Sequence, residues 1–306
     1  MLDIMIYYFQ FKYNRYRMNN KAFFKYIFAL LLFGSNGIVA SFIDLSSQNI
    51  VLLRTLIGSI LLISVFFISG GKLTFYKHKR QFLNLMVSGI AMGTSWMFLY
   101  EAYARIGVSI ASLLYYCGPV IVMALSPLLF KEKLTANKVL GFLAVVIGVI
   151  LINRNAFDGK GDLFGITCGL LSAVMYAFMV VCNKKATDIV GLENSTLQLT
   201  IAFLTVAIFV GLKQGYVMQI APTSILPILI LGLLNTGIGC YFYFSSIGKL
   251  KVQTVAICGY LEPLSAVLFS VAFLKETMLP LQIIGAVLII GGAMCGELIK
   301  QKEHKL

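Results

Sequence analysis

Charge and histidine are scarce in this sequence. Of its 306 residues, 12% are Asp, Glu, Lys or Arg and 59% are apolar or aromatic, and the mean hydropathy is +0.89. Soluble domains average about 25% charged and about 45–50% apolar residues. Because the chain has too few polar side chains to cover a surface in water, a soluble enzyme and a nucleic-acid-binding domain are both disfavoured.

Residues that hold metals or cofactors are also few or scattered. Histidine occurs only as His78 and His304, both in Lys-rich polar segments. The six cysteines fall within apolar stretches, with no CxxC spacing and no histidine nearby. This pattern favours neither a zinc site nor a disulfide framework. We therefore expect no metal, no cofactor and no histidine-based catalytic triad.

Long apolar runs dominate the sequence instead. A transmembrane helix needs ~20 mostly apolar residues to cross ~30 Å of hydrocarbon, whereas a membrane barrel shows alternating segments of about 10 residues. The runs therefore predict an all-α integral membrane protein with ten transmembrane helices. These helices are expected at residues 23–43, 48–69, 82–101, 107–130, 134–152, 162–183, 195–213, 225–247, 252–274 and 278–298.

Lysine and arginine are distributed unevenly between alternate connections. With the N-terminus inside, 19 of the 25 Lys and Arg residues fall on the inner side and 5 on the outer side, and the remaining one, Arg54, lies within a span. Cytoplasmic loops carry the excess of Lys and Arg. We therefore predict a multi-pass protein of the cell membrane with both termini cytoplasmic, residues 1–22 and 299–306 being its tails.

The second half of the sequence repeats the first at a fixed offset of 144 residues. We predict five helices in each repeat, over residues 23–152 and 162–298. Since five is odd, the two repeats must cross the membrane in opposite orientations, an architecture that can alternate about a site near the midplane. The repeated landmarks are Pro119 and Pro263, Lys131-Glu132 and Lys275-Glu276, Gly141 and Gly285, and Gly148 and Gly292.

These landmarks also carry a resemblance to a known family. The run from Pro119 through Lys131-Glu132-Lys133 to Gly148, and its partner from Glu262-Pro263 to Gly292, resembles the repeated EamA-type domain of the drug/metabolite transporter superfamily. The resemblance covers nearly the whole chain from about residue 23. It implies a secondary transporter, commonly an exporter or exchanger of small metabolites such as amino acids, amines or drugs.

Glu262 is the first candidate for a coupling or gating role. It lies ten residues into the ninth predicted helix, about 15 Å along the helix axis and near the midplane. A carboxylate there can bind a proton or a cationic substrate group. The alternative is that Glu262 only hydrogen-bonds the helix interrupted by Pro263 or a neighbouring span.

Arg54 and Glu101 are the other two ionisable candidates for coupling or gating. Both lie near the outer ends of their spans, where they can pair at similar depth. Such a pair can fix geometry or exchange partners during opening. For Arg54, snorkelling to the outer headgroups is an equally weighted alternative.

Aromatic and amide side chains within the spans are candidates for substrate binding. Small-molecule sites have apolar walls with few polar groups, but aromatic residues are also common in lipid-facing and packing positions. An amide such as Asn36 or Asn235 can bind substrate or bridge helices. The candidates are Trp96, Tyr100, Tyr115, Tyr260, Asn36 and Asn235.

Other residues are expected to serve structure. The GxxxG pairs Gly89 and Gly93, Gly165 and Gly169, and Gly292 and Gly296 permit close helix approach, within the bundle or between subunits of a homodimer. We expect packing within the bundle. We also assign a structural role to the repeated landmarks Pro119, Pro263, Glu132, Glu276, Gly141 and Gly285.

Three function classes can be compared. ATP-driven transport needs a phosphate-binding GxxxxGK[ST] loop, which the sequence lacks, so the expected energy source is a proton or other ion gradient. An intramembrane enzyme needs paired carboxylates, a nucleophile with a base, or a set of metal ligands at matching depth. We expect none of these arrangements inside the membrane. A lipid scramblase or scaffold fits the composition but does not require an inverted repeat. Secondary transport of a small molecule by alternating access is the preferred function.

Overall fold

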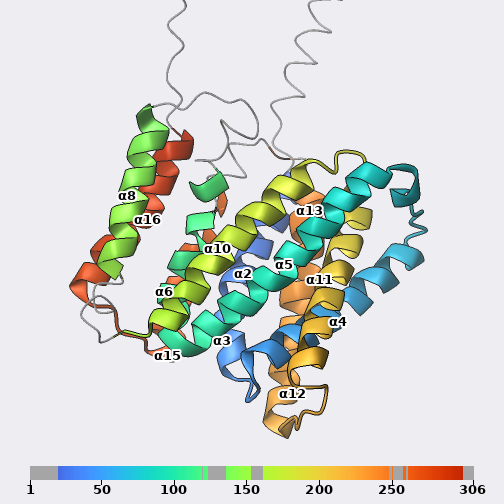
Figure 1. Ribbon diagram of the computed structural model, residues 1–306, viewed down its shortest axis with the longest axis horizontal. Helices are drawn as coiled ribbons and strands as arrows, with labels where there is room; N and C mark the ends of the chain where they lie inside the picture. The colour runs from blue at the N-terminus through green and yellow to red at the C-terminus, as the bar shows by residue number, and fades with distance from the viewer. Residues whose placement is uncertain are drawn as a thin grey trace, which may run out of the picture.

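The protein is a bundle of helices (Figure 1). The computed structural model describes residues 20–118, 120–122, 136–152, 161–247, 250, 258–259 and 261–298. Within these ranges helices are joined by short connections and no strand is present. The helices of the first repeat are α2 (Asn20–Gly34), α3 (Asn36–Ser41), α4 (Ser47–Ile68), η1 (Phe75–Lys77), α5 (Lys79–Ile106), α6 (Val108–Tyr115) and α8 (Ala136–Ile152). Those of the second are α10 (Leu163–Lys184), α11 (Gly191–Lys213), α12 (Pro222–Leu229), η2 (Ile230–Ile238), α13 (Gly239–Ile247), α15 (Leu261–Leu274) and α16 (Pro280–Leu298).

Helices lie at all ten predicted positions. Six described helical segments are long and apolar enough to cross a membrane, and the shorter apolar helices α6, α8, α15 and α16 occupy the fourth, fifth, ninth and tenth positions. Large apolar side chains such as Phe67, Ile68 and Leu268 are exposed on the outside of the bundle, where lipid can cover them. The prediction of an all-α, multi-pass membrane protein is confirmed.

The packing of the helices follows the internal repeat. In the first repeat α2 packs against α13 and α15, and in the second the equivalent helix α10 packs against α5 and α6. Other contacts join equivalent helices: α4 with α11, α6 with α15, and α8 with α16. The packing of α5 against α11 is matched by that of η2 against α4. These principal contacts of one repeat thus have counterparts in the other.

The pair of α8 and α16, which stands side by side at one edge of Figure 1, shows the orientation of the repeats. A Cβ on Gly148 would lie 2.6 Å from the carbonyl oxygen of Gly285, and one on Gly292 would lie 2.8 Å from that of Gly141. Gly141 and Gly285 are repeat counterparts, and so are Gly148 and Gly292. The later glycine of each helix thus faces the earlier glycine of the other helix. The two helices are therefore antiparallel, as opposite orientations of the repeats require.

Two spans are interrupted. The first breaks at Ser35, between α2 and α3, and the eighth passes from α12 through a nine-residue π-helix, η2, into α13. These interruptions fall at Asn36 and Asn235, where the sequence has an amide with a glycine one or two residues after it. π-helical turns within α-helices are uncommon and often mark functional sites.

Glycines of the GxxxG pairs serve packing within the bundle, as predicted. Gly89 and Gly93 lie against α11, since Cβ atoms there would come 2.7 Å from Ile201 and 2.8 Å from the carbonyl oxygen of Ala202. Gly169 lies against Leu114 of α6 in the same way. Association of two copies stays a prediction.

Glu276 has a structural role across the repeats. Its carboxylate accepts hydrogen bonds from the backbone N–H groups of Val108 at 2.8 Å and Ser109 at 3.0 Å. It thereby caps the start of α6, where a carboxylate is favoured by the helix dipole. The predicted landmarks Pro119 and Glu132 lie outside the described residues.

Candidate functional site

Arg54 lies inside the bundle, on α4, and is 1% exposed. Its Nε donates to Thr236 Oγ1 of η2 at 2.9 Å, and its Nη1 donates to the Tyr100 hydroxyl of α5. The guanidinium also stacks on Trp96, with 4.4 Å between its carbon and the ring centroid. Gly58 permits this arrangement, because a Cβ there would come 2.8 Å from Thr236 and push α4 away from η2. We call Arg54, Trp96, Tyr100 and Thr236 the Arg54 site.

Neither expectation for the surroundings of Arg54 is met. The side chain is fully buried, so it does not snorkel to the headgroups, and it makes no ion pair with Glu101. The physical reason is helical geometry. Arg54 faces Trp96 and Tyr100 on the inner side of α5, whereas Glu101 points to another side of the same helix.

Glu101 belongs to a network at one end of the bundle, where α4 begins, α5 ends and α10 begins. Its carboxylate accepts hydrogen bonds from Ser47 Oγ, from Gln48 Nε2 at 3.3 Å and from Arg105 Nε at 2.7 Å. Arg105 also donates to Asp162, at 3.2 Å. We call Ser47, Gln48, Glu101, Arg105 and Asp162 the rim network. Each of its three charged side chains has a partner of opposite sign.

Asp162 begins α10 and is held in its ionised form. Its Oδ1 accepts the backbone N–H of Gly165 at 2.9 Å, the bond of an N-cap residue. The Gly165 N–H and, to a lesser degree, the Arg105 guanidinium lower the pKa of this carboxyl below its usual value. The rim network is therefore a helix end whose charged side chains each have a partner of opposite sign.

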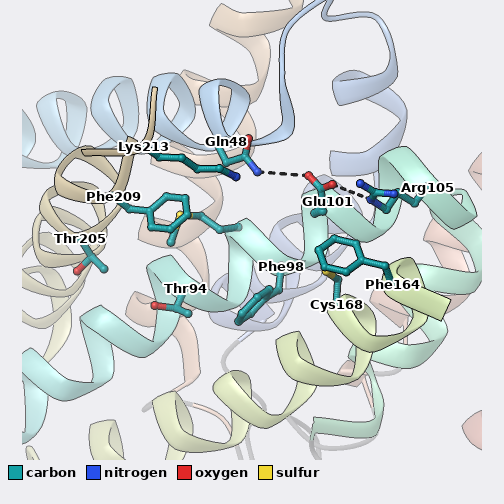
Figure 2. A pocket seen from close by; sticks show the side chains of 11 residues that line it. Gln48, Thr94, Phe98, Glu101, Arg105, Phe164, Cys168, Thr205, Phe209 and Lys213 are labelled. Atoms are coloured by element: carbon teal, nitrogen blue, oxygen red, sulfur yellow. Dashed lines mark hydrogen bonds and ion pairs between the residues drawn. The ribbon is translucent and has the colours of Figure 1, made fainter. Parts of the chain in front are cut away.

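A cavity of about 420 Å³ adjoins the rim network, between α4, α5, α10 and α11. Figure 2 shows Glu101 between Gln48 and Arg105, with the Lys213 side chain beside Gln48 and Phe209 at the left. Its charged groups come mostly from side chains that already have partners in the rim network. The lining residues are Gln48, Thr94, Met97, Phe98, Glu101, Arg105, Phe164, Cys168, Thr205, Phe209 and Lys213.

Glu262 lies in the first turn of α15 and is surrounded by tyrosines from both repeats. Its carboxylate interacts with the hydroxyl of Tyr116. Tyr115 lies within electrostatic range of the carboxylate and contacts Tyr176 edge to face, with 5.2 Å between ring centroids. We call Glu262 and the tyrosines that interact with it the Glu262 site; these tyrosines are Tyr26, Tyr103, Tyr115, Tyr116 and Tyr243.

Tyr103 joins the two interior sites. Its ring lies 5.3 Å from that of Tyr100, and it is within electrostatic range of both Arg54 and Glu262. The cation and the carboxylate nevertheless form no ion pair: Arg54 donates to Tyr100 and Thr236, and Glu262 interacts with Tyr116. Among the described residues, the structure thus places a cation and a carboxylate close together inside the bundle without pairing them.

The two predicted amides meet each other. Asn235 Nδ2 donates to Asn36 Oδ1 at 3.1 Å, to Ser35 Oγ at 2.9 Å and to the carbonyl oxygen of Leu32 at 2.8 Å. Both amides are buried. These bonds join η2 to the polar groups at the break between α2 and α3. Of the two alternatives for the amides, substrate binding and helix bridging, the structure shows helix bridging.

Sequence reasoning grouped some of these residues and missed others. Trp96 and Tyr100 come together at Arg54, and Tyr115 lies at Glu262, whereas Tyr260 lies outside the described residues. Tyr26 was missed because it lies close to the Lys-rich start of its span, where interfacial aromatics are ordinary. Among the described residues no three His, Cys, Asp or Glu side chains gather as a metal site would need.

Known proteins resemble this chain over most of its length. The model of the EamA-like transporter family matches twice, over residues 20–154 and 163–295. The uncharacterized transporter YxxF of Bacillus subtilis (strain 168) is 25% identical over 287 residues, covering 90% of this chain and 89% of that protein. The threonine/homoserine exporter RhtA of Escherichia coli (strain K12) is 25% identical over 265 residues, 85% of each chain. One solved crystal structure has a TM-score of 0.64 at 18% identity, covering 90% of this chain and 97% of the other.

Proposed function

The chain belongs to the EamA-like transporter family, and from that premise we propose that it is a secondary transporter of small metabolites. The membership confirms the resemblance found in the sequence. In the proposal, the two repeats alternate between outward-open and inward-open states, and the substrate binds between them. The protein lies in the cell membrane with both termini cytoplasmic.

The observation that carries this proposal is the placement of Glu262 among tyrosines from both repeats. Tyr116 of the first repeat and Tyr243 of the second both interact with the carboxylate. Ionisable groups inside a membrane are costly and mark substrate or ion pathways. Glu262 would neutralise a cationic group of the substrate or carry a coupling proton.

The interrupted helices support movement at the same place. A Cβ on Gly34, the last residue of α2, would lie 2.9 Å from the carbonyl oxygen of Glu262. The break at Ser35 therefore adjoins the start of α15, and Asn235 ties it to the π-helix η2. Broken helices beside the substrate are a recurring feature of secondary transporters.

The named relative suggests the first substrates to try. RhtA is named an exporter of threonine and homoserine, and we extend these two amino acids to this chain as candidates. Other amino acids, amines and cationic drugs complete the panel, and a proton gradient is the first driving force to test.

The test is counterflow of this panel in proteoliposomes, with and without a pH gradient, for the wild type and Glu262→Gln. We expect at least one panel member to exchange, and the Gln variant to lose the response to the pH gradient. Glu101→Gln serves as the comparison variant, because it removes a carboxylate that is already neutralised in the rim network.

Two results would contradict the proposal. Unchanged flux and pH response in a correctly folded Glu262→Gln variant would remove the role of this carboxylate. Lipid scrambling by the wild type, without flux of any solute, would replace secondary transport as the function.

A further inference from the structure

Arg54 is a buried cation without a carboxylate partner among the described residues. The described ion pairs join His78 to Asp188 and Arg105 to Glu101 and Asp162, and none of them includes Arg54. Glu262 lies within electrostatic range of Arg54 but forms no ion pair with it. An arginine side chain stays protonated in proteins. A buried charge is costly unless it is paired and hydrogen-bonded, so an interior arginine of this kind calls for an anion.

One nitrogen of the Arg54 guanidinium has no hydrogen-bond partner. Nε and Nη1 donate to Thr236 and Tyr100, whereas Nη2 is buried and has no hydrogen-bond partner. Buried donors of this strength are rarely left unsatisfied. A carboxylate oxygen at Nη2 would satisfy this donor and neutralise the charge at once, as arginine and carboxylate commonly do in bidentate pairs.

Resting on the proposed function, we infer that Arg54 binds the carboxylate of the transported metabolite. Trp96 and Tyr100 hold the guanidinium in place, by stacking and by the hydrogen bond to Nη1. Thr236 ties it to η2 of the other repeat. The guanidinium is closed off in this conformation, so the anion reaches it when α4 and η2 move apart.

The neighbouring Glu262 site completes the chemical class of the substrate. Tyr103 and Cys240 each lie within electrostatic range of both Arg54 and Glu262. A zwitterion places its carboxylate at Arg54 and its ammonium at Glu262, and its two charges then balance those of the protein. A purely cationic amine or drug would meet the unpaired charge of Arg54 and be disfavoured. The inference thus narrows the substrate to small zwitterions.

The test uses solutes that differ only in the carboxylate. A panel of neutral α-amino acids, each paired with its carboxamide and with the amine left by decarboxylation, is offered in counterflow to the wild type, Arg54→Gln and Arg54→Lys. We expect wild type to prefer an acid over its amide by at least about tenfold. Arg54→Gln should lose this preference, and Arg54→Lys, which keeps the charge but not the planar fork, should retain part of it.

Binding is measured separately, as the shift in unfolding temperature that each solute produces in detergent. Arg80→Gln is the matched control, because it removes an exposed arginine at the start of α5 and should keep the preference. If acids bind but no solute is exchanged, the transport proposal fails and the carboxylate site stands.

Three results would overturn the inference itself. The first is equal exchange of acids and amides by the wild type, which would leave the transport proposal intact. The second is an Arg54→Gln variant in which acid and amide exchange fall by the same factor, as a purely structural arginine would give. The third is the absence of any acid that shifts the unfolding temperature.

Discussion

The α4 and α5 pair presents two arginines in contrasting surroundings. Arg105, at the rim, is exposed and bonds to Glu101 and Asp162. Arg54, inside the bundle, is 1% exposed and has only hydroxyl and aromatic partners. Desolvation costs little for Arg105 and much for Arg54. Nevertheless it is Arg105, the arginine with the lower desolvation cost, that has carboxylate partners.

This difference separates structural from functional charge. At the rim, opposite charges and backbone groups satisfy one another, so the network needs no ligand to be stable. At the Arg54 site a buried guanidinium nitrogen has no hydrogen-bond partner, and the proposed carboxylate ligand would supply one. The contrast can be tested by removing charges in the two regions and measuring stability and transport together.

Arg54→Met should have the largest effect, and on transport alone. Methionine removes the charge and keeps a flexible apolar side chain like the stem of arginine, and a buried charge without a partner of opposite sign is costly to the folded protein. We expect exchange of zwitterionic solutes to fall about 100-fold or more, while the unfolding temperature in detergent stays the same or rises. Both are measured on the same purified preparation.

A matched change at the rim sharpens this prediction. Arg105→Met should leave exchange within about twofold of wild type, because its charge serves only partners near the surface. If Arg54→Met lowered the unfolding temperature strongly and Arg105→Met abolished exchange, the assignment of function to the interior and structure to the rim would be reversed.

The sequence predicts the architecture better than the partners of the interior charges. Apolar runs and the 144-residue offset locate the helices and the inverted repeats, since run length and an odd number of spans leave few alternatives. The pairing of Arg54 with Glu101 was a wrong prediction, because depth along a helix does not specify direction around it. The meeting of Asn36 with Asn235, or of Tyr116 with Glu262, depends on contacts between distant helices, which periodicity does not encode.

Glu276 tests the structural end of the comparison, with an intermediate effect. Its carboxylate caps α6 through the N–H groups of Val108 and Ser109, and loss of a cap costs about 0.5–2 kcal/mol. Glu276→Ala should therefore lower the free energy of unfolding by about 1 kcal/mol, read as a lower unfolding temperature, while acid-over-amide preference is kept. The exposed neighbour Thr277→Ala is the control. A change in solute preference without loss of stability would show that Glu276 acts in transport rather than in helix capping.

Asp162 should show the smallest effect, and only in acid. Its carboxyl has a lowered pKa in the folded protein, first through the Gly165 N–H and then through Arg105. The stabilisation is therefore fully present above the ordinary Asp value of about 3.9 and is lost as the pH falls through the lowered pKa. Asp162→Asn should therefore unfold at a lower temperature than wild type at pH 6. The two unfolding temperatures should be closer at pH 3, where the wild-type carboxyl is itself becoming protonated. The measurement is the difference in unfolding temperature at the two pH values, and a difference that grows toward pH 3 would show that the rim network is not held by this carboxylate.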